Sequence, residues 1–198
     1  MEMMRYKYVI GIDEVGRGPL AGPVTVCAAA IPRGTKLDPL PNGVKLNDSK
    51  KLTAKSREAW AKKLKARGVV FAISSVTPEV IDRINISKAA NRAVERSLRR
   101  LTEKKGISLT HSLIFLDGGL YAKGGRTVIK GDAKINAVKA ASILAKVRRD
   151  KYMKKLSLKY PKYGFEEHVG YGTRSHIAAI KKHGLSPAHR KSFCHSFV

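Results

Sequence analysis

Short apolar runs alternate with longer amphipathic segments along this chain, a pattern typical of an α/β domain. The apolar runs predict strands over residues 6–12, 25–31, 69–76, 112–116 and 127–130. The amphipathic segments predict helices over residues 54–67, 78–84, from 87 onwards, 136–160 and 173–183, with Thr53 and Ser87 as N-caps and Pro78 at a first helical position. We therefore expect a central mixed sheet flanked by helices. The run at 112–116 is apolar enough for a sheet centre covered on both faces.

The chain after Pro161 adds only helices and loops to this pattern. We expect residues 1–160 to form the main domain. Residues 161–198 should form a small helical C-terminal extension that packs on it as part of the same unit. No low-complexity linker separates the two parts.

The charge of the chain is strongly unbalanced. Its 198 residues include 40 Lys and Arg but only 15 Asp and Glu, a formal net charge of +25, while 43% are hydrophobic, enough for a folded core. A folded protein with this excess is expected to bind something anionic, and nucleic acid is favoured over a membrane surface. No apolar stretch approaches the roughly 18 residues that span a bilayer.

The start of the chain lacks the layout of a signal peptide, so we expect a cytoplasmic protein. Neither Cys27 nor Cys194 lies in a CxxC motif, and Cys27, in a run of small apolar residues, is expected to be a buried reduced thiol. The histidines form no pair with metal-ligand spacing. We expect His189 and His195 at the surface or in helix caps.

Because acids are so few, their positions are informative. Asp13 and Glu14 directly follow the first predicted strand, Asp117 follows the most apolar strand, and Asp132 follows the short strand at 127–130. If these strands are neighbours, the carboxylates converge and repel one another unless a divalent cation neutralises them. Oxygen-only ligands suit Mg²⁺ or Mn²⁺, which can catalyse phosphodiester hydrolysis. The alternative is that each acid merely caps a turn.

Five ordered blocks of the sequence resemble ribonuclease HII of the bacterial type. They are Gly11-Ile-Asp-Glu-Val-Gly-Arg-Gly-Pro-Leu-Ala-Gly-Pro-Val24; Leu46-Asn-Asp-Ser-Lys-Lys-Leu-Thr53; Leu116-Asp-Gly118; Lys130-Gly-Asp-Ala-Lys134 followed by Ala140-Ala-Ser-Ile-Leu-Ala-Lys-Val147; and Gly170-Tyr-Gly-Thr-Arg-Ser-His176 with His189-Arg-Lys-Ser-Phe193. The resemblance implies a ribonuclease H-like fold. It also implies endonucleolytic cleavage of RNA in RNA/DNA hybrids and at single ribonucleotides in duplex DNA, leaving 3′-hydroxyl and 5′-phosphate ends.

The resemblance also implies roles for particular residues. Asp13, Glu14, Asp117 and Asp132 correspond to the four catalytic, metal-binding carboxylates. Gly16-Arg17-Gly18 corresponds to the tripeptide that contacts the ribose 2′-hydroxyl, the group that distinguishes RNA from DNA. Tyr171 resembles the tyrosine that stacks on the sugar at the RNA–DNA junction.

Ser49 and Lys50 could bind phosphates through hydroxyl, amide and ammonium groups, although a solvated loop before a helix cap explains them equally well. We expect a monomer. Two other functions stay open at this point: a non-catalytic basic protein that binds structured RNA, and a related nuclease that resolves branched DNA.

Overall fold

The computed structural model describes residues 6–197. The start of the chain, on which the signal-peptide prediction depends, therefore lies outside the described residues, as do residues 1–5 and 198 of the expected domain ranges. A five-stranded mixed sheet has the order β3-β2-β1-β4-β5. Its strands are β1 (Tyr8–Val15), β2 (Val24–Pro32), β3 (Val70–Val76), β4 (Ser112–Asp117) and β5 (Arg126–Val128). β1 pairs antiparallel with β2, and β2 with β3, whereas β1–β4 and β4–β5 are parallel. This confirms the expected mixed sheet.

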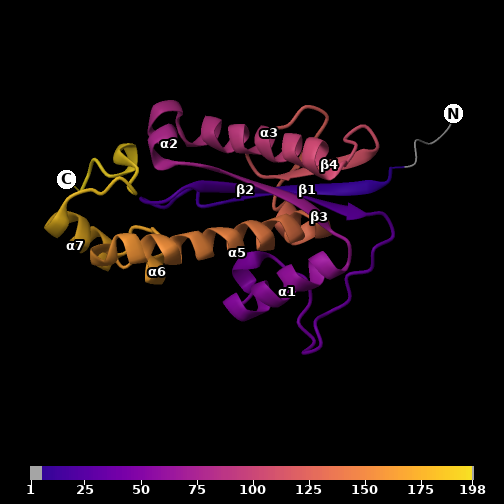
Figure 1. Cartoon of the computed structure of the whole chain (residues 1–198), viewed down its shortest axis with the longest axis horizontal. Coiled ribbons are helices and arrows are strands. Elements are labelled where there is room, and N and C mark those ends of the chain that lie inside the picture. Colours follow the sequence, from indigo (N-terminus) through magenta and orange to yellow (C-terminus); the bar gives the residue numbers. More distant parts are fainter. Residues whose placement is uncertain (1–5, 198) are drawn as a thin grey trace.

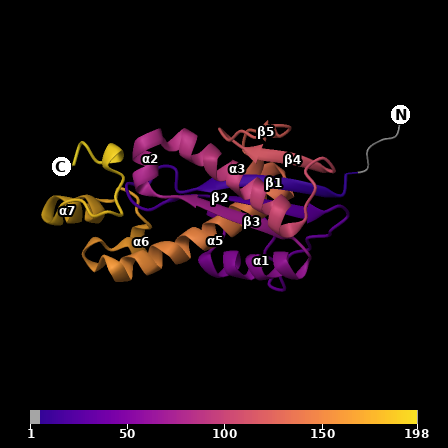
Figure 2. The ribbon, with the colours of Figure 1, turned by 45° about the horizontal axis from the view of Figure 1, so that its top comes forward.

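Helices cover both faces of the sheet (Figures 1 and 2). On one face lie α2 (Pro78–Ile84) and α3 (Ile86–Lys105), and on the other α1 (Ala54–Ala66) and α5 (Asn136–Lys159). Alternate residues of β2 supply the two cores: Val26 and Ala28 pack toward α3, while Cys27 and Ala29 pack toward α1 and α5. A strand covered on both faces must be apolar throughout, and Cys27 is a buried free thiol as expected.

Gly11 allows α5 to approach β1 very closely. A Cβ built on Gly11 would lie 2.0 Å from the carbonyl carbon of Ala137 and 2.2 Å from the backbone nitrogen of Val138, so any side chain there would collide with backbone. Asp13, two residues along the same strand, points to the same face as Gly11. The first turns of α5 therefore lie directly beside that carboxylate.

The structure corrects two predicted boundaries near the carboxylates. β1 extends to Val15 rather than ending at residue 12, because β2 continues to pair with it: Asp13 lies opposite Cys27 and Glu14 opposite Val26. The last predicted strand is shorter and begins earlier, at Arg126, and Asp132 lies in the first turn of the short helix α4 (Gly131–Lys134).

A third correction concerns the start of α3. Asn85, not Ser87, is its N-cap: the Asn85 side chain accepts a hydrogen bond from the backbone N–H of Lys88 at 3.0 Å, and its φ is 64°. Two further predicted starts are confirmed, since Thr53 accepts from Ser56 N at 3.1 Å and Pro78 opens α2. Asparagine is one of the few non-glycine residues that tolerates this left-handed φ.

The C-terminal portion consists of short helices: η2 (Pro161–Tyr163), α6 (Phe165–His168), α7 (Arg174–His183) and η3 (Lys191–Phe193). They lie at one end of the sheet (Figure 1) and share a small core with Leu20, Ala21 and Met153 of the preceding chain. His189 is 3% exposed within this portion, so the prediction of a surface or cap position was wrong for it. Among residues 6–197, no helix is both long and apolar enough to cross a bilayer.

Candidate active site

Two acidic residues in β1 begin the site. Asp13 is 5% exposed, and burial together with the neighbouring charge of Glu14 raises its pKa well above the ordinary value. Its Oδ1 accepts a hydrogen bond from the Glu14 backbone N–H at 2.8 Å. Burial also raises the pKa of Glu14, although Arg17, whose Nη1 is 3.5 Å from Glu14 Oε1, opposes that shift. The other carboxylate oxygen, Glu14 Oε2, is buried and has no hydrogen-bond partner among the described residues.

Asp117 lies at the end of β4, the strand next to β1. The parallel register pairs Ile12 with Leu116, which places Asp117 beside Asp13. Asp117 Oδ1 accepts from the backbone N–H of Gly131 at 2.7 Å and of Asp132 at 3.4 Å, so this carboxylate fixes the first turn of α4. Burial, and then the charge of Asp117, raise the pKa of Asp132.

The structure brings the four carboxylates together around Asp117. Its negative charge raises the pKa of each of the other three, Asp13, Glu14 and Asp132. Groups that repel one another in this way gain free energy when a cation is placed between them. The parallel β1–β4 pair and the short α4 are the elements that create this juxtaposition.

The donor set fits a hard divalent cation. All four side chains offer oxygen, and Glu14 Oε2 is a buried oxygen without a partner. As the side chains stand, no three Asp, Glu, His or Cys residues within 6–197 surround one point closely enough to hold an ion. A cation would have to draw the carboxylates inward, and the Asp117 hydrogen bond to Gly131 is one of the contacts that would have to adjust.

The tripeptide Gly16-Arg17-Gly18 follows β1 directly. Gly16 has φ +85°, a conformation that favours glycine, and a Cβ there would lie 2.2 Å from Nε of Arg149. At Gly18 a Cβ would meet no described atom within 4 Å, so that side of the loop is open. Arg17 extends over α3, where its Nη2 donates to Ser87 Oγ at 2.7 Å.

Tyr171 lies on a loop that packs against the chain just after the tripeptide. The Gly170 carbonyl accepts from the backbone N–H of Leu20 at 2.8 Å, and the Tyr171 carbonyl from Nδ1 of His176 at 2.9 Å. The backbone is thus fixed while the Tyr171 side chain is 45% exposed. It does not pack into the core, which leaves its ring free to contact a ligand.

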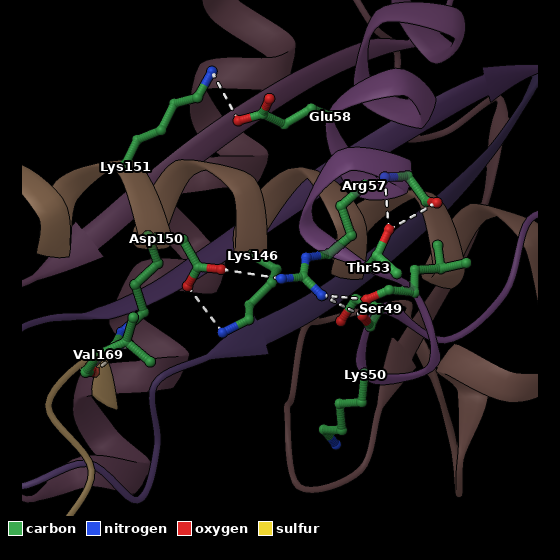
Figure 3. Close-up of polar contacts among 12 residues, drawn as sticks. Ser49, Lys50, Thr53, Arg57, Glu58, Lys146, Asp150, Lys151 and Val169 are labelled. Carbon is green, nitrogen blue, oxygen red and sulfur yellow. Dashed lines mark hydrogen bonds and ion pairs between the residues drawn. The ribbon is translucent and has the colours of Figure 1, made fainter. Parts of the chain in front are cut away.

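Ser49 and Lys50 lie in η1 (Ser49–Lys51) and differ in exposure. Ser49 is buried: its Oγ accepts from Ser142 Oγ at 2.8 Å and its carbonyl from Arg57 at 3.0 Å. Ser142 also neighbours Asp13 and lowers the pKa of that carboxyl. Lys50 is exposed, and its side chain extends away from the polar network around Arg57 and Asp150 (Figure 3). Its charge lowers the pKa of Asp132.

Two buried arginines contribute to this region, and residue patterns predicted no role for either. Arg149, in α5, and Arg190, before η3, are both fully buried and donate to backbone carbonyls of the loops that carry the tripeptide and Tyr171. Arg190 stands within one of the five blocks, between His189 and Lys191, but nothing in its local pattern indicates burial.

Comparison with known sequences gives one family. The model described as Ribonuclease HII matches residues 10–196. A protein named Ribonuclease HII from Shouchella clausii is 44% identical over 188 residues, which cover 95% of this chain and 69% of that protein. One from Bacillus anthracis is 43% identical over 204 residues, covering 98% of this chain and 75% of that protein.

Comparison with solved structures agrees. Ribonuclease H2 from Pyrococcus horikoshii has a TM-score of 0.69 at 27% identity, covering 93% of each chain. A chain in the PCNA:RNase HII complex from Archaeoglobus fulgidus has a TM-score of 0.71 at 24% identity, covering 93% of this chain and 94% of that one. Bst-RNase HIII, solved in complex with Mn²⁺, has a TM-score of 0.67 at 17% identity, covering 98% of this chain and 69% of that one. These likenesses confirm the ribonuclease H-like fold.

Proposed function

The chain belongs to the ribonuclease HII family, whose members are hydrolases that cleave RNA in RNA/DNA hybrids, and we propose that it also nicks duplex DNA 5′ of a single embedded ribonucleotide. The products would carry 3′-hydroxyl and 5′-phosphate ends. The observation that supports this most is the group of four carboxylates around Asp117. Family membership favours the hydrolase over an RNA-binding protein or a resolvase, neither of which accounts for the family match.

We propose that Asp13, Glu14, Asp117 and Asp132 hold Mg²⁺ or Mn²⁺. When bound as a pair, such ions lower the pKa of an attacking water and stabilise the departing 3′ oxygen. The chain itself supplies the preformed negative site: burial keeps the carboxyls in a low-dielectric environment, and the amides of Gly131 and Asp132 orient Asp117. The metal requirement follows from the cost of keeping these charges together without one.

The residues proposed to select the substrate are different from the four carboxylates. The net charge of +25 would attract any duplex through its phosphates and would not tell RNA from DNA. We propose that the backbone of Gly16-Arg17-Gly18 contacts the ribose 2′-hydroxyl and that Tyr171 stacks on the sugar at the RNA–DNA junction. Lys50 is the exposed candidate for a phosphate contact. The same role for Ser49 stays a prediction, with its hydroxyl turned toward Ser142.

We further infer a monomer that works in the cytoplasm. All the proposed site residues come from one chain, so no second copy is needed to complete the site. Both cysteines are buried and free, as is usual in a reducing compartment. We also propose that residues 161–198 work as one unit with residues 1–160, because Leu20 and Met153 are part of the C-terminal core.

A cleavage assay tests the proposed function. An end-labelled DNA duplex with one ribonucleotide is incubated with the protein and Mg²⁺ or Mn²⁺, beside an all-DNA duplex of the same sequence and an RNA/DNA hybrid. We expect a nick 5′ of the ribonucleotide whose 3′ end a DNA polymerase can extend, and no cut in the all-DNA duplex. The Asp13→Asn variant should bind duplex and not cut. An intact ribonucleotide duplex with both metals would refute the proposal, and equal activity of Asp13→Asn would refute its metal role.

A further inference from the structure

Arg190 uses all three nitrogens of its guanidinium group to hold the loop that contains the tripeptide. Nη2 donates to the Gly16 carbonyl at 2.6 Å, Nη1 to the Arg17 carbonyl at 2.8 Å and Nε to the Gly22 carbonyl at 3.0 Å. Arg190 is fully buried, more than 160 positions along the chain from these partners. The planar group with diverging donors can bridge separate carbonyls in a way that a single ammonium cannot.

This contact is unusual because the charge of Arg190 is balanced by carbonyl dipoles. Neither Arg190 nor Arg149 forms an ion pair with any residue in the described part of the chain. Burial, then the charge of Arg149, lower the pKa of Arg190 to about 9, while Asp82 opposes the shift, so the group stays protonated at neutral pH. A buried charge is costly, and what offsets that cost here is the three carbonyls of the tripeptide loop that Arg190 satisfies.

The contact determines which way the tripeptide presents its backbone. Because the carbonyls of Gly16 and Arg17 accept from Arg190, both point into the protein. Arg149 packs against the same loop, with its Nε 2.2 Å from the position that a Cβ of Gly16 would take. The open side of the loop at Gly18 therefore faces solvent, while the arginines hold the opposite side of the loop.

Arg149 connects this loop to the one that carries Tyr171. Arg149 Nη1 donates to the Val169 carbonyl at 2.9 Å and its Nη2 to the Ala21 carbonyl at 3.2 Å. The backbone N–H of Arg190 donates to the Leu20 carbonyl at 2.8 Å. The tripeptide loop and the Tyr171 loop are therefore joined by the Arg149 guanidinium and by the backbone N–H groups of Leu20 and Ala21, which both donate to the Gly170 carbonyl.

We propose that Arg190 is a positioning residue for ribose recognition: its guanidinium fixes the backbone of Gly16-Arg17-Gly18 so that the protein selects a 2′-hydroxyl. This rests on the proposed function, in which the tripeptide reads that group. Arg190 does not touch the substrate. It acts by preventing the tripeptide carbonyls from rotating outward, and so keeps the loop in one conformation before the duplex arrives.

The test compares Arg190→Met with a variant of matched stability. Ile180→Ala removes a buried side chain from the same C-terminal core without contacting the tripeptide. Each protein is checked by circular dichroism and thermal unfolding and then assayed below both melting temperatures. The readouts are the single-turnover cleavage rate of a one-ribonucleotide duplex at saturating enzyme, and the affinity for an all-DNA duplex.

We expect Arg190→Met to cleave about ten- to a hundredfold more slowly, as a misplaced recognition group does, while its affinity for all-DNA duplex changes less than about twofold. Ile180→Ala should cleave within about threefold of the parent. If Arg190→Met does not fold, Arg190→Lys replaces it, and we expect the same slow cleavage because one ammonium cannot reach all three carbonyls.

Two results would overturn the inference: a folded Arg190 variant that cleaves like the parent, or an Ile180→Ala variant that loses cleavage to the same degree, which would make the effect one of general stability. Failure of the proposed function is a different outcome. There, the parent protein itself would leave the one-ribonucleotide duplex intact.

Discussion

Acid should destabilise the C-terminal portion through two buried histidines, His176 and His189, joined in one hydrogen-bonded chain. The Ser186 backbone N–H donates to His189 Nδ1 at 2.9 Å, so His189 carries its proton on Nε2. That N–H faces His176 Nε2 at 3.1 Å, and His176 in turn donates from Nδ1 to the Tyr171 carbonyl at 2.9 Å. Every ring nitrogen in this chain is satisfied only when both histidines are neutral.

The size of the effect follows from the pKa of His176. Burial, with the charges of His168 and His189, lowers it from 6.5 to about 4. Because the pKa is lowered in the folded state, the unfolded state binds more protons in this range, and stability falls as the pH drops from about 6.5 toward about 4. At about 1.4 kcal/mol per pKa unit, the loss is about 2 kcal/mol by pH 5 and about 3 kcal/mol in full.

The raised pKa values of Asp13, Glu14 and Asp132 act in the opposite direction, since protonating those carboxyls in acid relieves their repulsion. The histidine contribution must therefore be isolated by difference. His176→Asn keeps a donor near the position of Nδ1 and cannot become charged. The exposed His111, changed to Asn, is the matched control.

The measurement is urea unfolding at about pH 7.5 and about pH 5, followed by far-ultraviolet circular dichroism and by fluorescence of the single tryptophan, Trp60, in α1. The stability advantage of the parent over His176→Asn should shrink by about 2 kcal/mol at the lower pH, and His111→Asn should show no such change. An advantage that is the same at both pH values would refute the proposed chain of neutral rings. Disagreement between the two signals would locate the loss in the C-terminal portion.

Three further outcomes are expected. Gly11→Ala should lower the free energy of unfolding by about 3 kcal/mol, because the added Cβ would collide with the backbone at Ala137; a loss below about 1 kcal/mol in urea would contradict the packing described. Asp117→Asn should abolish cleavage yet leave stability unchanged or about 1 kcal/mol higher, since the charge that repels its neighbours is gone; marked destabilisation would argue against that repulsion. Tyr171→Ala should slow cleavage at an RNA–DNA junction with metal binding by calorimetry unchanged, and lost metal binding would contradict its assigned role.

The order of strands and helices could be predicted because its signals are local. Thr53 is a good N-cap wherever a helix follows it, and Pro78 suits only a first turn. The run at 112–116 is a strand as expected, but it lies beside the edge strand β5 and Leu113 and Phe115 are only half-buried, so the expectation of a sheet centre covered on both faces was wrong for it. That Asp13 and Asp117 lie close together could also be expected, since each acid directly follows an apolar run that predicts a strand.

The errors arose where pairing between distant segments overrides local preference. Asp13 and Glu14 are poor strand formers, so the first strand was expected to end before them, yet β2 continues the ladder to Val15. Likewise Ser87 is an ordinary N-cap in sequence, but the chain turns at Asn85, whose left-handed backbone is fixed by α2 ending directly before it.

Buried cations are the part of the site that residue patterns could not reveal. Arginine is a surface residue by default, and the sequence holds 40 Lys and Arg in all. Arg149 and Arg190, the two arginines that are buried within residues 6–197, have nothing in their spacing to mark them. What draws them inward is a set of carbonyls at residues 16–23, in a loop too rich in glycine and proline to satisfy its own acceptors by forming a helix or strand. The carbonyl acceptors lie in the first quarter of the chain, and the arginine donors lie in the last quarter. The proposed catalytic acids can therefore be located from the ends of neighbouring predicted strands, whereas the residues that hold the proposed ribose-reading loop can be located only once the fold has brought both ends of the chain together.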